Sequence, residues 1–327
     1  MIILTGGAGM IGSMIAWHLN TVLNENKFII VDEFMIPDQE KNISKRNFTD
    51  LISKDDLPKY LKKNNDIEAI IHMGAISATT ESNFNNLLSS NIRYSQFLWD
   101  WSSKNRVPFI YASSAATYGG GEFGYEDDIK PLSKLNPLNA YGYSKHFFDM
   151  WVQNQLQIGQ SQPPKWFGLK FFNVYGPNEY HKGRMSSVVY HAFNQYKKDK
   201  EIRLFKSKNP DYKDGMQLRD FIYVKDAVNC IFHLLSNCKL SGLYNIGSGK
   251  AQSFIDLAKA LLKNLNEPSS LIRYIEMPKD LENKYQYFTE ANISQLRNSG
   301  YDLKFNNLMN GISDYTKNYL SKSDQYA

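Results

Sequence analysis

The 327-residue chain is predicted to have an α/β fold, in which a doubly wound parallel sheet is combined with a smaller α/β domain. Apolar strand patterns alternate with helix patterns through the first half, which favours parallel strands with helices on both faces. These strand patterns lie at 2–5, 28–31, 68–72 and 108–112. The length exceeds what one compact core usually holds, so two domains are expected. We assign 1–174 plus 219–243 to the larger domain and 175–218 plus 244–327 to the smaller one.

Composition indicates a globular protein and excludes several classes of function. Hydrophobic residues make up 42% and aromatic residues 14% of the chain, which fits a substantial core. The net charge is +5 with basic residues spread along the chain, so no nucleic-acid partner is expected. No apolar run approaches the roughly 18 residues of a membrane span, and a strand pattern beginning at Ile2 leaves no room for a signal peptide. We expect a soluble cytoplasmic protein without a membrane partner.

The thiols and imidazoles give no sign of a metal site. Cys230 and Cys238 lie near each other in one helix pattern, and the six histidines show no metal-ligand spacing. Structural thiols in a reducing compartment are therefore expected.

The first strand pattern leads into a glycine-rich turn, and a helix pattern then continues to about residue 23. Gly6 permits the tight turn, Gly9 lets the backbone approach a pyrophosphate, and Gly12 lets the helix pack closely on the strand. The helix N-terminus offers free N–H groups to phosphates. The next strand pattern ends at Asp32, 20 residues after Gly12, as expected for a carboxylate that binds ribose hydroxyls. The segment is typical of a Rossmann-type dinucleotide site.

The residues after Asp32 leave the choice between NAD and NADP open. Four basic residues follow, namely Lys41, Lys45, Arg46 and Lys54. Either all four are solvated, or one or two of them lie near a ribose 2′-phosphate, which would favour NADP. Glu33 favours NAD, because a second carboxylate would repel that phosphate.

Two further strand patterns end in turns of small residues. The pattern 68–72 leads into the turn 73–77, and the pattern 108–112 is followed by Ser113 and Ser114. Open α/β sheets bind ligands at these carboxyl ends. A helix pattern between them, from about residue 82 to 105, contains Asn91, which either reaches the cofactor or is an ordinary polar surface residue.

Tyr141 and Lys145 are four residues apart in a helix pattern, so they share one face of the helix. A free phenol, with a pKa of about 10, is a poor base at neutral pH. The Lys145 ammonium beside Tyr141 is expected to lower that pKa towards the working range.

The second half is expected to supply the remaining contacts. The strand pattern 166–172 ends at Asn173, after which the chain turns into the second domain. The basic loop 181–184 is either solvated or binds a sugar or phosphate. Arg219 either takes a diphosphate bidentately or pairs with a neighbouring aspartate.

Other segments of this half have simpler interpretations. A short strand pattern at 202–205 precedes the charged loop or lid 206–216. A helix pattern from about 226 to 235 should pack back on the first domain, and Ser253 is a candidate N-cap for the helix pattern 255–265.

Four strings in order carry a family resemblance: TGGAGMIG at 5–12, YASSAATYGG at 111–120, YGYSK at 141–145 and FFNVYGP at 171–177. Together they resemble the extended short-chain dehydrogenase/reductase superfamily. Further strings are similar to the ADP-L-glycero-D-manno-heptose 6-epimerases of that superfamily, namely 73–81, HKGRM at 181–185, LRDFIYVKDA at 218–227, YNIGSGKAQSF at 244–254 and 284–302. The resemblance covers essentially the whole chain.

The resemblance implies an isomerase that inverts C6 of an ADP-heptose through a transient 6-ketone, for lipopolysaccharide inner-core synthesis. Tyr141 would be an acid/base, Lys145 its partner, Lys182 a second acid/base and Ser114 a donor to the reacting oxygen. The larger domain would bind NADP, with NAD as the alternative, and the smaller domain the nucleotide sugar. A homo-oligomer, a pentamer, is also implied.

The resemblance assigns the remaining site residues by position. The cofactor would contact Gly6, Gly9, Met10, Ile11, Gly12, Asp32, Glu33, Lys54, Met73, Gly74, Ala75, Ile76, Ser77, Asn91, Tyr141, Lys145, Val174 and Lys182. The substrate would contact Ser114, Asn173, Arg184, His191, Phe205, Lys206, Ser207, Lys208, Arg219 and Tyr285. No metal is implied.

The sequence departs from the family pattern at several positions. Glu33 stands where an uncharged residue is common, and Gln39 replaces an expected lysine, for which Lys41 is a substitute. Arg184 occupies a position where a small hydroxyl residue is expected. The segments 119–124 and 207–216 are longer than usual. These departures bear on cofactor choice and substrate contacts.

Three rival functions are weighed against this one. Related 4,6-dehydratases carry an Asp-Glu pair just after the active-site hydroxyl residue, where this chain has Ala115 and Ala116. Another nucleotide-sugar epimerase of the same fold stays open. A non-catalytic dinucleotide-sensing scaffold would not need Ser114, Tyr141 and Lys145 together.

Overall fold

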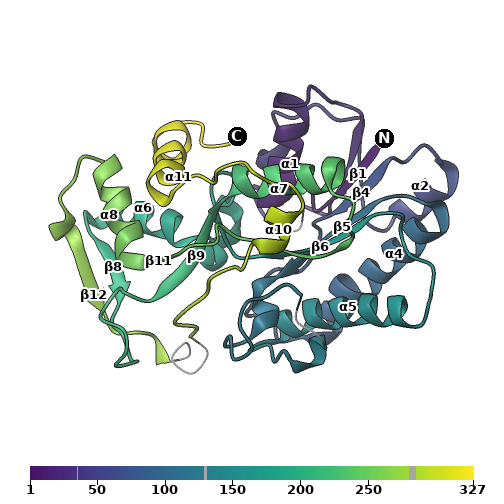
Figure 1. Ribbon diagram of the computed structural model, residues 1–327. Helices are drawn as coiled ribbons and strands as arrows, with labels where there is room; N and C mark the ends of the chain where they lie inside the picture. Colours follow the sequence, from purple (N-terminus) through teal and green to yellow (C-terminus); the bar gives the residue numbers. More distant parts are fainter. Residues whose placement is uncertain (35, 129–130, 280–284) are drawn as a thin grey trace.

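The computed structural model describes residues 1–34, 36–128, 131–279 and 285–327. Its main feature is a seven-stranded parallel sheet with the order β10-β6-β5-β4-β1-β2-β3 (Figure 1). The strands are β1 (Ile2–Thr5), β2 (Phe28–Val31), β3 (Asp50–Ile52), β4 (Ala69–His72), β5 (Phe109–Ser114), β6 (Trp166–Phe171) and β10 (Gly242–Ile246).

Helices cover both faces of this sheet. Alternate residues of each strand point to opposite faces, so Leu4 of β1 joins one apolar cluster and Ile3 joins the other. The first cluster includes α1 (Met10–Thr21) and α7 (Val224–Asn237). The second includes α2 (Leu57–Lys63), α4 (Tyr94–Asn105) and α5 (Ala140–Gln157). The fold class predicted from the sequence is thereby confirmed.

The remaining chain forms smaller sheets and helices at one end of the large sheet (Figure 1). A three-stranded sheet has the order β11-β9-β7, and β12 pairs with β8 in parallel. The strands are β7 (Asn173–Tyr175), β8 (Ile202–Phe205), β9 (Leu218–Tyr223), β11 (Ala251–Ser253) and β12 (Ile272–Ile275). The helices are α3 (Phe84–Leu87), beside the large sheet, and α6 (Val188–Asp199), α8 (Phe254–Asn264), α10 (Ser294–Asn298) and α11 (Leu308–Tyr315).

Several local predictions are confirmed. Ser253 caps α8, its hydroxyl accepting from the backbone N–H of Asp256. Helix α7 packs against α1, and both cysteines are free and buried. The predicted helix 82–105 is present, but a π-helical turn at Leu88–Arg93 separates α3 from α4.

The predicted division into domains stays a prediction. Strand β10 belongs to the large sheet, and the boundary expected after residue 243 falls inside it. None of the helices in the described ranges combines the length and hydropathy needed to cross a bilayer. Within the same ranges, no three metal-binding side chains gather as a set of ligands.

Candidate active site

A cleft of about 540 Å³ opens at the carboxyl ends of β1, β5 and β6. Its walls include the glycine-rich turn, the end of β5, the first turns of α5 and the segment 181–188. The predicted site residues that line it are Gly6, Gly9, Met10, Ile11, Gly12, Asp32, Met73, Ala75, Ser77, Ser114, Tyr141, Lys145, Asn173, Val174, Lys182 and Arg184. A neighbouring hollow adds Glu33, Lys54, Gly74 and Ile76.

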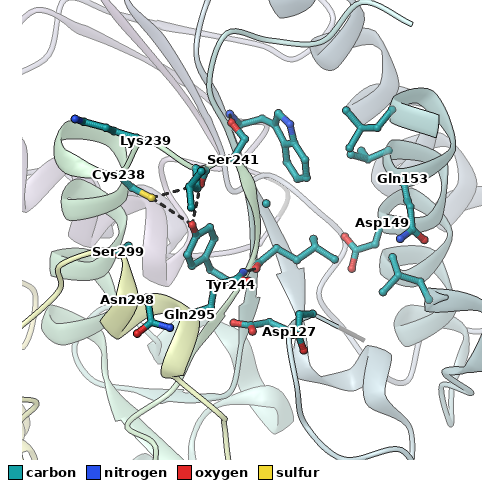
Figure 2. Close-up of a pocket in the computed structure, with 18 of the residues that line it drawn as sticks. Asp127, Asp149, Gln153, Cys238, Lys239, Ser241, Tyr244, Gln295, Asn298 and Ser299 are labelled. Carbon is teal, nitrogen blue, oxygen red and sulfur yellow. Dashed lines mark hydrogen bonds between the residues drawn. The ribbon is translucent and has the colours of Figure 1, made fainter. Parts of the chain in front are cut away.

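A larger cavity, of about 1100 Å³, lies elsewhere, between the edge strand β10 and α5 (Figure 2). It is lined by residues such as Gln153, Cys238 and Tyr244 and by none of the predicted site residues. Most of the predicted site residues therefore gather in the smaller cleft and its neighbouring hollow.

At two positions of the glycine-rich turn there is room for backbone only. Gly6 has a φ of +66°, and a Cβ there would lie 2.5 Å from the nitrogen of Gly74. A Cβ on Gly12 would lie 2.0 Å from the carbonyl oxygen of Gly6. Gly9 caps α1 without any side-chain hydrogen bond, which leaves the first N–H groups of the helix available to an anion.

Asp32 lies at the end of β2, beside this turn. Its carboxylate accepts hydrogen bonds from the backbone N–H groups of Ala8, at 2.8 Å, and Glu33, at 2.8 Å. The amide of Gln39 also donates to it, at 3.2 Å. Lys54 forms an ion pair with Glu33, with 3.0 Å between Nζ and Oε2.

Tyr141 and Lys145 lie in the first turns of α5, whose N-cap is Asn139. The Asn139 side chain accepts from the backbone N–H of Gly142 at 2.8 Å, which fixes the start of the helix next to Tyr141. Lys145 Nζ donates to the carbonyl oxygen of Ala112 in β5, at 2.8 Å. Ser114, at the end of the same strand, also lines the cleft.

The titration of these groups corrects one sequence-based expectation. Burial raises the pKa of the Tyr141 phenol, although a hydrogen bond with Ser114 acts in the opposite direction. Burial also lowers the pKa of Lys145 to about 8. The expected lowering of the Tyr141 pKa by Lys145 is therefore wrong, because removal of the phenol from water is the largest effect on that pKa and raises it.

A second basic group enters the cleft from a 3-10 turn at Tyr180–Met185. Burial lowers the pKa of Lys182, opposed by the Glu179 carboxylate. Its Nζ lies 3.8 Å from the sulfur of Met10, in the first turn of α1. The buried Asn42 side chain links this turn to the glycine-rich turn, since its amide nitrogen donates to the carbonyl oxygen of Ala8, at 2.8 Å, and lies 3.1 Å from Nδ1 of His181.

Asn91 is buried beneath the cleft rather than in it. Its side-chain amide exchanges two hydrogen bonds with the backbone of Ile76, at 2.9 and 3.0 Å, and donates to Ser144, at 3.0 Å. It therefore shapes the turn 73–77 from behind.

The other predicted substrate residues do not line the cleft, and their role stays a prediction. The guanidinium carbon of Arg219 lies 5.8 Å from the ring centre of Phe254, which lines the cleft, and 5.2 Å from the ring centre of Tyr285. Lys206 and Lys208 both pair with Glu276, at 2.8 and 2.9 Å, outside the cleft. The other three are Phe205, Ser207 and His191.

The structure adds cleft residues that the sequence analysis did not select. They are Ile36, Gln39, Ala112, Ser113, Phe171, Phe172, His181, Met185, Ser186, Ser187, Val188, Phe221 and Phe254. Eight of these thirteen lie within two positions of a predicted residue, so extending each motif by two positions would have found those eight.

The cleft fits a dinucleotide. Gly6 and Gly12 leave no room for a Cβ, so the turn stays tight against the start of α1, whose first N–H groups have no side-chain cap, and Asp32 lies beside both. The cradle would hold the diphosphate, Asp32 the adenosine ribose, and Lys145 the second ribose.

Comparison with known proteins agrees with this geometry. Residues 2–247 match the model of the NAD dependent epimerase/dehydratase family. The chain is 52% identical to the ADP-L-glycero-D-manno-heptose-6-epimerase of Fusobacterium nucleatum and 42% identical to that of Nitratidesulfovibrio vulgaris, with each alignment covering all of both chains.

Solved structures show the same fold. The crystal structure of the Helicobacter pylori ADP-L-glycero-D-manno-heptose-6-epimerase superposes with a TM-score of 0.78 at 26% identity, over 97% of this chain and 95% of that one. A dTDP-glucose 4,6-dehydratase from Bacillus anthracis, in complex with NAD, gives a TM-score of 0.79 at 20% identity, over 99% and 98%. From the family match and its full-length relatives, the chain belongs to the NAD dependent epimerase/dehydratase family, in the group of the ADP-L-glycero-D-manno-heptose-6-epimerases.

Proposed function

We propose that the chain inverts C6 of the heptose in ADP-D-glycero-β-D-manno-heptose, giving the L-glycero epimer for lipopolysaccharide inner-core synthesis. The observation that carries this is the gathering of Ser114, Tyr141, Lys145 and Lys182 in the cleft that holds the dinucleotide cradle. The full-length relatives support the choice of sugar.

The proposed reaction needs protons to move at one oxygen in two geometries. When bound, the nicotinamide would supply the hydride acceptor, and then the donor, that makes and reverses a C6 ketone. Either Tyr141 or Lys182 removes the C6 hydroxyl proton. The other returns a proton to the same oxygen after the ketone has rotated to present its opposite face. Ser114 donates to the reacting oxygen. Two proton donors on different segments allow hydride return to the opposite face.

Incubation with ADP-D-glycero-β-D-manno-heptose, without added cofactor, tests the proposal. NMR at C6 should show conversion to the L-glycero epimer, driven by dinucleotide retained from expression. If no conversion follows even after NAD or NADP is added, the heptose is not the substrate, and other nucleotide sugars of the same fold are next.

We further propose that the cofactor is NAD rather than the NADP implied by the family resemblance. Asp32 and Glu33 place two carboxylates beside the expected ribose, where they would repel a 2′-phosphate. The nearby cations are already paired, Lys54 with Glu33 and Lys41 with Asp38, the latter at 2.6 Å.

Calorimetric titration of protein stripped of dinucleotide tests this choice. NAD should bind at least about tenfold more tightly than NADP, a difference of about 1.4 kcal/mol. Glu33→Gln should reduce the preference for NAD over NADP, measured as the ratio of their two Kd values. The control Glu40→Gln changes an exposed glutamate outside the cleft and should leave that ratio unchanged. Tighter binding of NADP would contradict the proposal.

The oligomeric state and compartment rest on resemblance alone. We propose a homo-oligomer, a pentamer, in the cytoplasm. Light scattering on the purified protein would give its mass.

A further inference from the structure

A buried ion pair lies directly behind the reaction centre. Asp149 of α5 and Lys170 of β6 are 3.3 Å apart, and both side chains are 0% exposed. Neither lines the cleft. Taking two charges out of water is costly unless hydrogen bonds complete the arrangement, so their partners indicate what the pair does.

Asp149 holds the end of β5. It follows Lys145 by four residues, so both lie on the face of α5 that packs on the sheet. Its carboxylate accepts from the hydroxyls of Tyr111, at 3.0 Å, and Ser113, at 2.7 Å. These two residues flank Ala112, whose carbonyl oxygen binds Lys145. Figure 2 shows the Asp149 carboxyl group directed from the helix towards the strands.

Lys170 holds the turn that follows β5. Its Nζ donates to the hydroxyl of Thr117 at 2.6 Å, and that hydroxyl donates to the carbonyl oxygen of Ser114 at 2.8 Å. The ammonium also lies 4.6 Å from the ring centre of Tyr118. The ion pair therefore contacts the chain both before and after Ser114. Asp149 accepts from Ser113, and Lys170 donates to Thr117.

Strand register and one glycine make the arrangement fit. Ser113 lies opposite Lys170, and Tyr111 lies opposite Gly168, in the parallel pairing of β5 and β6. A Cβ on Gly168 would lie 2.4 Å from the Tyr111 hydroxyl. The absence of a side chain at Gly168 lets Tyr111 reach Asp149.

We propose that the Asp149–Lys170 pair is a positioning element that sets Ser114 and Lys145 in the geometry needed for proton transfer. The proposal rests on the function proposed above, because it is measured through that reaction. Asp149, Lys170 and Thr117 act through their neighbours and do not touch the substrate.

Thr117→Val and Thr117→Ser form a matched pair that tests it. Valine removes the hydroxyl between Lys170 and Ser114 while keeping the shape, and serine keeps the hydroxyl. Thr117→Val should lower kcat by about tenfold, or 1.4 kcal/mol, with KM and dinucleotide affinity unchanged, and Thr117→Ser should restore kcat. Hydrogen exchange should quicken only around 113–118, where the N–H of Ala116 donates to the Ser114 hydroxyl.

A double variant separates positioning from plain stability. Asp149→Asn or Lys170→Met alone leaves one buried charge unpaired and should lower Tm. Asp149→Asn combined with Lys170→Met removes both charges, so Tm should largely return while kcat stays low. If kcat returns with Tm, or if Thr117→Val keeps the wild-type kcat, the pair is structural only. If the unmodified protein fails to convert the heptose, the proposed function fails instead, and the local change in exchange still reports on positioning.

Discussion

Tyr141 and Lys182 are the two side chains on which proton transfer is predicted to depend. Tyr141→Phe and Lys182→Met each remove one donor while keeping most of the side-chain volume, so each should lower kcat by about 10²- to 10⁴-fold. Dinucleotide affinity should change little for Tyr141→Phe. Initial rates of epimer formation by NMR measure the effect, and full activity in both variants would show that the assignment is wrong.

The sequence predicted Tyr141 from its spacing to Lys145, which is a local property, and Lys182 from the family resemblance. It did not predict the direction of the Tyr141 pKa, which depends on how completely the fold removes the phenol from water. The sequence also did not predict that Lys206 and Lys208 pair with Glu276. That pairing joins residues 70 and 68 positions apart in the chain. Asp149 could have been selected from the sequence, because it follows Lys145 by four residues and so lies on the same face of the helix.

At the scale of single elements, we expect the N-cap of α5 to affect activity as well as stability, because it adjoins Tyr141. Asn139→Ala removes the cap next to Tyr141 and should cost about 1 kcal/mol of folding stability. Ser253→Ala removes the equivalent cap of α8 and should cost a similar amount. Only Asn139→Ala should also lower kcat, because α8 carries neither acid/base group. Equal activity losses, measured with Tm, would contradict this.

Strand β10 is an edge of the large sheet, and Asp127 caps part of that edge. Its carboxylate accepts from the backbone N–H of Asn245 at 2.8 Å. Burial raises the pKa of Asp127 to about 6, from an ordinary value of 3.8. As pH rises through this window the unfolded chain loses the proton first, so the free energy of unfolding falls, by about 2–3 kcal/mol in the limit.

Asp127→Asn should therefore raise Tm at about pH 7.5 and change it little at about pH 3, below both pKa values, where most of the carboxyl group is protonated in both states. The exposed Asp66→Asn serves as the control. A gain for Asp127→Asn that is larger in acid than at neutral pH would show the opposite linkage.

Strands β1, β2, β4 and β5 followed from the sequence because strand patterns are strong in the first half, whereas β3 and α2 were not predicted. The π-helical turn at Leu88–Arg93, which packs against α5, did not follow from the sequence either. Nor did the pairing of β7 with β9 and β9 with β11, which joins segments separated in sequence. Hydrophobic patterns in the sequence therefore predict single strands and helices, whereas the pairing between strands depends on how distant segments pack.

At the scale of the whole molecule, the cleft is made by segments that meet only after folding. Asn42 illustrates this, because its one side chain contacts the glycine turn through Ala8 and the Lys182 turn through His181. The dinucleotide cradle and the second acid/base are thus held together through buried polar contacts. Ligand binding at the cradle should consequently stabilise the whole chain.

Gly12→Ala tests that linkage, because its Cβ would meet the carbonyl oxygen of Gly6 at 2.0 Å. For the unmodified protein stripped of dinucleotide, NAD at a free concentration 100 times its Kd should add about 2.7 kcal/mol and raise Tm by several degrees. Gly12→Ala should lose that rise. The control is Gly242→Ala, whose nearest contact would be 3.8 Å away and which should keep it. An undiminished rise in Gly12→Ala, measured by differential scanning fluorimetry, would place the dinucleotide outside the glycine-rich turn.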